Sequence, residues 1–225
     1  TWMSDARNRT ASVPVYNYQL KTPVVNSATY RVIKFPAESP QHPGGAPSLH
    51  TDPWMMAGGN ATSLKWHNDG AIEHDSTRGN NVYAAEDRNN TNAVIDKAAV
   101  SQTPQPSLTF DYVPDFTASP IVTSPPNQQF NITNLFYWNN IMHDISYIYG
   151  FDEVSGNFQK DNQGRGGLGN DHVFADAQDG GGTNNANFAT PVDGTNPRMQ
   201  MYIWTAPNPD RDGDADNGII AHEFG

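Results

Sequence analysis

A histidine and a glutamate stand side by side near the end of the chain, in the sequence His222-Glu223-Phe224-Gly225. These residues match the first four positions of a His-Glu-x-x-His pattern. Histidines four apart on a helix project from one side and can hold one zinc ion, while the glutamate between them faces a zinc-bound water as general base. We therefore predict that His222 is a zinc ligand and that Glu223 takes the proton of a water that attacks a peptide carbonyl.

A run of acidic residues comes just before that pair. Asp210, Asp212, Asp214 and Asp216 place four carboxylates within seven residues, and a hard cation would relieve their mutual repulsion. We predict calcium as a second cation, held by Asp212, Asp214 and Asp216. Two other interpretations stay open. One is a twelve-residue calcium loop from Asp212 to Glu223, although its sixth position is an asparagine where the sharp turn requires glycine; the other is a solvated acidic turn.

The regular element that stands out is a helix near residues 133–150. Apolar residues recur three and four apart, Thr133 or Asn134 can cap the start, and Gly150 stands at the stop. His143 lies inside this helix next to Asp144. A catalytic role is conceivable, but a lone histidine in a helix is more often packed or hydrogen-bonded, and we expect that structural role.

The remaining sequence predicts short strands and long loops. Prolines and glycines punctuate residues 14–126, and β-type runs such as Val15–Tyr18 and Tyr30–Phe35 lie between them. Six prolines within residues 101–128 forbid a regular helix there and predict a connector over the surface. Further along, Met199–Trp204 predicts a strand, with Asn184–Phe188 as its partner.

Composition excludes several classes of function. The chain of 225 residues has no cysteine, which rules out thiol catalysis, disulfides and cysteine-bound metals. Its formal net charge of −11 argues against nucleic acid or an anionic membrane as partner. No stretch approaches the roughly 20 continuous apolar residues of a membrane span, so we expect a soluble chain.

Export is a further expectation. Asn-x-Ser/Thr triplets at Asn8, Asn60, Asn89 and Asn131 fit a glycosylated exported protein, although such triplets also arise by chance in an asparagine-rich chain. The first seven residues lack the apolar run of a signal peptide, so we expect a mature or excised form rather than a nascent one.

Many separate segments, in one order, resemble the secreted fungalysin-type zinc metallopeptidases, a family related to thermolysin-like enzymes. The matching segments cover nearly the whole chain: Glu38-Ser39-Pro40, Trp66-His67-Asn68-Asp69-Gly70, Thr77-Arg78-Gly79-Asn80-Asn81-Val82, the helix Phe136–Gly150, Gly166-Gly167-Leu168-Gly169-Asn170-Asp171, Gln178-Asp179, residues 184–191, Met199-Gln200-Met201-Tyr202 and residues 216–223.

This resemblance implies an α+β fold, the β-rich N-terminal lobe of a thermolysin-like metallopeptidase, with the long helix near 133–150 and the start of the zinc helix at the C-terminal end. It implies three regions: an N-terminal remnant at 1–14, a β-rich, loop-rich region at 15–128, and the helix, substrate-edge strand and start of the zinc helix at 129–225. It also implies secretion, protein or peptide substrates, and Asn185 and Ala186 as the residues that hold the substrate backbone.

Family members continue beyond this point with a second histidine, a downstream glutamate ligand and a helical lobe that closes the cleft. The chain therefore resembles the N-terminal half of such an enzyme. We expect it to be inactive alone, with Ile219, Ile220 and Phe224 uncovered, and to have the missing C-terminal half and its own propeptide as partners. The alternative function is a noncatalytic calcium- or carbohydrate-binding extracellular β module.

Overall fold

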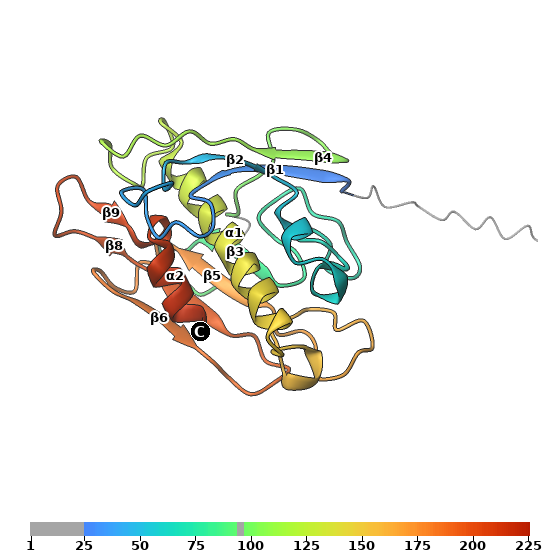
Figure 1. The fold of residues 1–225 in the computed structure, drawn as a ribbon. Helices are drawn as coiled ribbons and strands as arrows, with labels where there is room; N and C mark the ends of the chain where they lie inside the picture. Colours follow the sequence, from blue (N-terminus) through green and yellow to red (C-terminus); the bar gives the residue numbers. More distant parts are fainter. Residues whose placement is uncertain (1–24, 94–96) are drawn as a thin grey trace, which may run out of the picture.

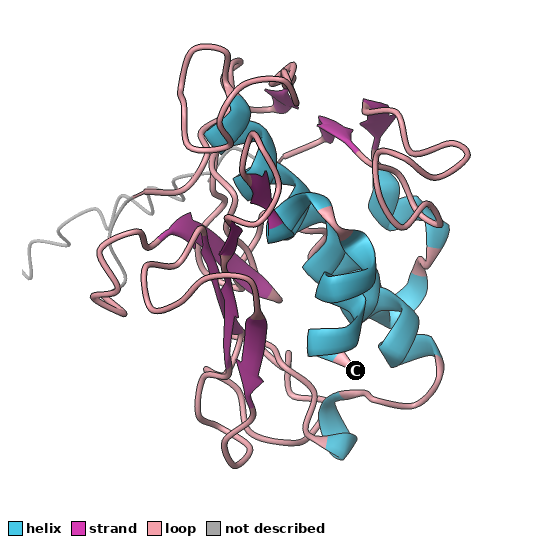
Figure 2. Cartoon of the chain, turned by 90° about the vertical axis from the view of Figure 1, so that its left-hand side faces the viewer, coloured by secondary structure: helices cyan, strands magenta, loops and turns pink. Residues whose placement is uncertain are grey.

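The computed structural model describes residues 25–93 and 97–225. The long helix α1 (Asn127–Ile148) contacts a three-stranded sheet and, through β3 and β5, a four-stranded one, and the short helix α2 (Asn217–Phe224) packs beside it (Figures 1 and 2). This is the α+β architecture that the sequence predicts. The N-terminal remnant and the predicted strand Val15–Tyr18 lie outside the described residues.

The three-stranded sheet has the order β2-β1-β4. Its strands are β1 (Ser27–Val32), β2 (Ser48–Thr51) and β4 (Ser107–Phe110); β2 runs antiparallel to β1 and β4 runs parallel to it. Strand β4 corrects one expectation, because residues 101–128 are more than a surface connector. Leu108 and Phe110 point into the core and are buried, so this proline-rich segment contributes a strand between its turns.

The four-stranded sheet has the order β3-β5-β7-β6. Strands β3 (Val82–Glu86), β5 (Val173–Ala177) and β7 (Arg198–Met201) are parallel, and β6 (Ala186–Ala189) is antiparallel to β7 and forms the edge. The predicted strand Met199–Trp204 is split at Tyr202. Its second part is β8 (Ile203–Trp204), which pairs with β9 (Arg211–Asp212) in a separate small sheet.

Helix α1 begins earlier than predicted. It starts at Asn127, directly after Pro126, so Thr133 and Asn134 are buried inside the helix and do not cap it. Proline is tolerated ahead of the first turn because the first backbone N–H groups of a helix have no partner inside it. The stop is confirmed: the helix ends at Ile148, and Gly150 adopts a positive φ of 103° that favours glycine.

The part of the chain that the structure describes also contains four 3₁₀ turns: η1 (Pro53–Met56), η2 (Gly59–Thr62), η3 (Glu153–Ser155) and η4 (Gly213–Ala215). Turn η4 leads directly into α2. Among the described residues, no helix is both long enough and apolar enough to cross a lipid bilayer.

Candidate active site

His222 and Glu223 lie on helix α2, whose other face is buried in the core. The Asp216 side chain caps its start by accepting hydrogen bonds from the backbone N–H groups of Gly218 and Ile219. Ile220 and Phe224 are four apart and face the core, whereas His222 is exposed and Glu223 is half-buried. The expectation that Ile220 and Phe224 lack cover is wrong, because this chain itself buries both.

A cluster of aromatic rings joins α2 to the edge of the four-stranded sheet. The ring of Phe224 lies 5.9 Å from that of Phe158 and 6.2 Å from that of Phe188 in β6. Phe158 and Phe188 are 5.7 Å apart, so the three rings form one apolar contact. Aromatic pairs at such separations stabilise by their buried area and by edge and tilted contacts. The position of Glu223 relative to strand β6 is therefore fixed by packing.

The predicted edge strand is confirmed, but it begins at Ala186. Asn185 lies just before it and is exposed, whereas Ala186 is buried. Asn184 forms the turn ahead of them, with a positive φ of 56°. Its Oδ1 accepts a hydrogen bond of 2.9 Å from the backbone N–H of Thr205, which fixes the loop after β8. The free side of β6 leaves main-chain groups available to an added strand.

A tyrosine that the sequence did not single out lies near this edge. The Tyr202 hydroxyl and Asn187 Nδ2 are 2.6 Å apart. Burial raises the pKa of the Tyr202 phenol, and the charges of Asp179 and Glu223 raise it further, against the hydrogen bond from Asn187. Tyr202 therefore stays protonated at neutral pH, within electrostatic reach of Glu223. In the sequence, Tyr202 stood out only as the last residue of the matching segment Met199-Gln200-Met201-Tyr202.

The acidic run before α2 separates into different environments. Asp212 and Asp214 are buried at turn η4, Asp210 is partly exposed, and Asp216 is the cap of α2. The twelve-residue calcium loop is wrong, because the helix begins at its sixth position and Glu223 lies within that helix. The solvated turn is also wrong for the two central carboxylates, since neither faces solvent.

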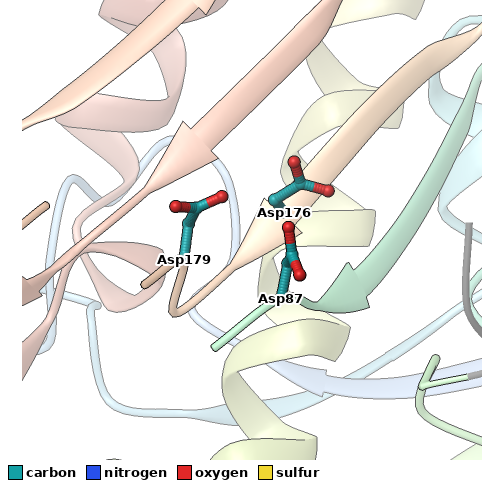
Figure 3. Close-up of side chains that lie close together, drawn as sticks. All are labelled: Asp87, Asp176 and Asp179. Atoms are coloured by element: carbon teal, nitrogen blue, oxygen red, sulfur yellow. The ribbon is translucent and has the colours of Figure 1, made fainter. Parts of the chain in front are cut away.

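A second acidic cluster was not predicted. Asp87 after β3, Asp176 in β5 and Asp179 after β5 offer carboxylate oxygens within 4.8 Å of one another (Figure 3). Each carboxylate has its own donors. Asp87 accepts from Thr91 and the Asn92 backbone, Asp176 pairs with Arg198, and Asp179 accepts from the Gly181 backbone and Gln200. About ninety residues separate Asp87 from the other two, so only the parallel pairing of β3 and β5 brings them together.

His143 has the structural role expected of it. Its ring is buried, and Nδ1 lies 3.0 Å from Oδ1 of Asp144. Oδ2 of Asp144 in turn accepts a hydrogen bond of 3.0 Å from the indole N–H of Trp66. This chain of contacts joins α1 to the loop that carries Trp66 and gives the Nδ1 side of the ring a structural role, while the buried Nε2 has no hydrogen-bond partner among the described residues.

The surroundings of His222 fit the role of a zinc ligand. The ring is exposed on the last turn of α2, and no described residue forms a hydrogen bond or ion pair with it. Its nitrogens are therefore free to bind a metal. Within residues 25–93 and 97–225, no group of three His, Asp or Glu ligands includes His222. The described residues thus supply one imidazole of the three protein ligands that a catalytic zinc requires.

Residues 29–225 match the family described as fungalysin metallopeptidase (M36). The chain belongs to this family. It is 42% identical over 200 residues to extracellular metalloproteinase 2 of Trichophyton tonsurans and 44% identical over 200 residues to that of Arthroderma otae. It is also 42% identical over 202 residues to extracellular metalloproteinase 3 of Trichophyton tonsurans. Each match covers 89% of this chain and 30% of the relative. The chain therefore spans less than a third of these fungalysins.

Membership of the fungalysin family supports the enzyme over the noncatalytic β module that the sequence left as the alternative. A metallopeptidase family implies a metal cofactor and peptide bonds as substrate. The names of the relatives describe them as extracellular. The roles of His222, Glu223, Asn185 and Ala186 stay predictions.

Proposed function

We propose that this chain forms the N-terminal part of the catalytic region of a secreted zinc endopeptidase. One observation carries the proposal. Helix α2 of a fungalysin chain carries the exposed His222 and the half-buried Glu223, and its buried side packs against the edge strand β6. A metal ligand, a general base and a strand that can receive a peptide thus lie together.

In this proposal His222 is one zinc ligand, and the other ligands come from outside the described residues. A bound zinc ion supplies a Lewis acid that polarises a carbonyl and lowers the pKa of water. Glu223 accepts a proton from the attacking water through its carboxylate. Glu223 is partly buried, and the next residue, Phe224, packs against Phe188, so the helix that carries the carboxylate is held against β6.

The substrate backbone adds to the free side of β6. An extended peptide there makes main-chain hydrogen bonds, which accounts for recognition of protein substrates of varied sequence. We assign the first contacts to Asn185, whose exposed side chain can bond the substrate backbone, and to the backbone of Ala186. The further partners in this proposal are the remainder of the enzyme, which completes the cleft, and its own propeptide.

The test uses the complete protein that contains this chain. The Glu223→Gln variant keeps the shape of the side chain but cannot accept a proton, so we expect full zinc content and at least a 1,000-fold loss of kcat, on the order of what removal of a general base costs. The His222→Gln variant should instead lose bound zinc. Glu38→Gln, on an exposed side chain, is the matched control and should retain activity. Near-normal turnover by Glu223→Gln would overturn the assignment.

A further inference from the structure

Two buried carboxyl groups meet at turn η4, away from His222 and Glu223. Asp212 is 7% exposed, Asp214 is fully buried, and one glycine separates them. Oδ1 of Asp212 accepts from the backbone N–H of Asp214 at 3.0 Å. Its Oδ2 accepts from Asn131 Nδ2 and Gln178 Nε2, both at 2.6 Å. Asp212 thus accepts from three donors among the described residues.

Asp214 has no comparable support. Neither carboxylate oxygen accepts a hydrogen bond, and Oδ1 of the buried Asn131 also lacks a donor. No ion pair of the described residues involves Asp212 or Asp214. A buried acceptor without a donor costs about 1–3 kcal/mol, and a buried charge costs more. Three buried oxygens, two on Asp214 at turn η4 and one on Asn131 in α1, therefore need an electropositive partner that these residues do not supply.

The surroundings select the kind of partner. A proton satisfies only one oxygen, whereas a cation can contact several. A cavity of about 370 Å³ borders Asn131 and Asp212 and can admit an ion with its waters. Oxygen ligands with waters suit a hard cation, and an irregular turn suits calcium better than magnesium, which demands near-ideal octahedral geometry.

We propose that turn η4 binds one calcium ion through the side-chain oxygens of Asp212, Asp214 and Asn131. This ligand set differs from the one that the sequence predicts, because Asp216 caps α2 and Asn131 comes from α1. The site joins α1 to the segment that begins α2. Asn134 Nδ2 already bonds the carbonyl of Asp214 at 2.7 Å and Oδ1 of Asn217 at 2.8 Å, so a bound ion would hold the start of α2 against α1.

The test measures calcium directly in the complete protein, first stripped of calcium and then dialysed against a buffer of fixed calcium and zinc concentrations. We expect the Asp214→Asn variant to bind one calcium fewer per chain than the wild type, by equilibrium dialysis and elemental analysis. Asp210→Asn is the matched control from the same acidic run and should bind as many calcium ions as the wild type. Terbium should replace calcium and show luminescence sensitised by Trp204, whose Nε1 would lie 3.4 Å from a Cβ placed on Gly213.

Stability gives an independent measurement. Asp214→Asn removes a buried carboxyl group that accepts no hydrogen bond. We therefore expect the calcium-free variant to be at least as stable as the calcium-free wild type, while its gain in Tm on adding calcium becomes smaller. Equal calcium content in wild type and Asp214→Asn, or a terbium signal unchanged by that substitution, would overturn the proposal. None of these measurements depends on hydrolysis, so they do not depend on the roles proposed for His222 and Glu223.

Discussion

The ring of Phe224, the residue after Glu223, lies 6.2 Å from the ring of Phe188 in the edge strand β6. This contact joins the helix that carries the proposed general base to the strand that would receive the substrate. The position of the base relative to the peptide is thus set by apolar packing. It follows that a core substitution at this contact should impair catalysis as well as stability.

The Phe224→Ala variant should test this relation. Its loss of buried ring contacts should cost about 3 kcal/mol of unfolding free energy, as for other buried phenylalanines. In the complete enzyme, kcat/KM should also fall, since α2 is less firmly held against β6. Urea unfolding and peptide hydrolysis measure the two effects. Tyr149→Ala, at an 88% exposed residue, is the control and should change neither. Full activity of a destabilised Phe224→Ala protein would contradict the relation.

Asn185 and Asn184 should respond differently to alanine. Asn185 is exposed and lies beside the substrate edge, so Asn185→Ala should lower kcat/KM about tenfold, the effect of losing one bond of about 1.4 kcal/mol. Its melting temperature should not change. Asn184 has a positive φ and anchors Thr205, so Asn184→Ala should lower the melting temperature. Unchanged kinetics in Asn185→Ala would mean that Asn185 does not bind substrate and belongs only to the turn.

Asp216 should act as a helix cap. Asp216→Ala removes the acceptor for the backbone N–H groups of Gly218 and Ile219, which should cost about 1 kcal/mol. Asp216→Asn keeps an acceptor at the same place and should retain most of that stability. Chemical denaturation of both variants measures the difference. Equal losses in the two would mean that the charge of Asp216, rather than its hydrogen bonds, supports α2.

The stability of the fold should fall in acid because of His67. Its Nδ1 lies 3.0 Å from the Ser76 carbonyl and its Nε2 lies 2.6 Å from the Tyr30 hydroxyl, which fits a neutral ring that donates from Nδ1 and accepts at Nε2. Burial lowers the pKa of His67 from 6.5 to about 3. The stability linked to this depressed pKa is present above pH 6.5 and is lost as the pH falls from 6.5 toward 3, by on the order of 5 kcal/mol.

Unfolding by urea at a series of pH values from 4 to 8 should show this effect. The His67→Gln variant cannot take up this proton, so its unfolding free energy should fall less steeply with acid than that of the wild type, although it starts lower at pH 7. His42→Gln, at an exposed histidine, should keep the slope of the wild type. The same slope in His67→Gln and wild type would show that other groups set the acid response.

The elements near His222 could be predicted from local sequence. Gly150 marks the end of α1 by its own residue type, whatever the first residue of the helix is. Apolar and polar residues alternate around Met199 and Phe188, which indicates strands even when their partners are unknown. The start of α1 was harder to predict, because burial of Asn131 and Asn134 overrides the preference of such residues for caps. The prolines of residues 101–128 also concealed β4, because its pairing with β1, about eighty residues earlier in the chain, leaves no local pattern.

In the candidate site too, residues adjacent in the chain could be predicted, and residues brought together by the fold could not. His222 and Glu223 are adjacent in the chain, so a motif reveals them. Tyr202 and Asn187 meet only through strand pairing, and the partner of Asp212 in α1 is Asn131, 81 residues earlier. A single sequence does not specify such distant contacts. It also gave no means to exclude Asp216 from the calcium ligands, because its role as a cap depends on where α2 begins.

The pairing of β3 with β5 has a consequence for synthesis of the chain. Val82 and Val173 are partners in this parallel pair, and both are fully buried. About ninety residues, including all of α1, must therefore be made after β3 before its partner exists. At a translation rate of about 5–20 residues per second, strand β3 waits roughly 5–20 s with an open, apolar edge. During that interval the unpaired strand is exposed to pairing with other chains.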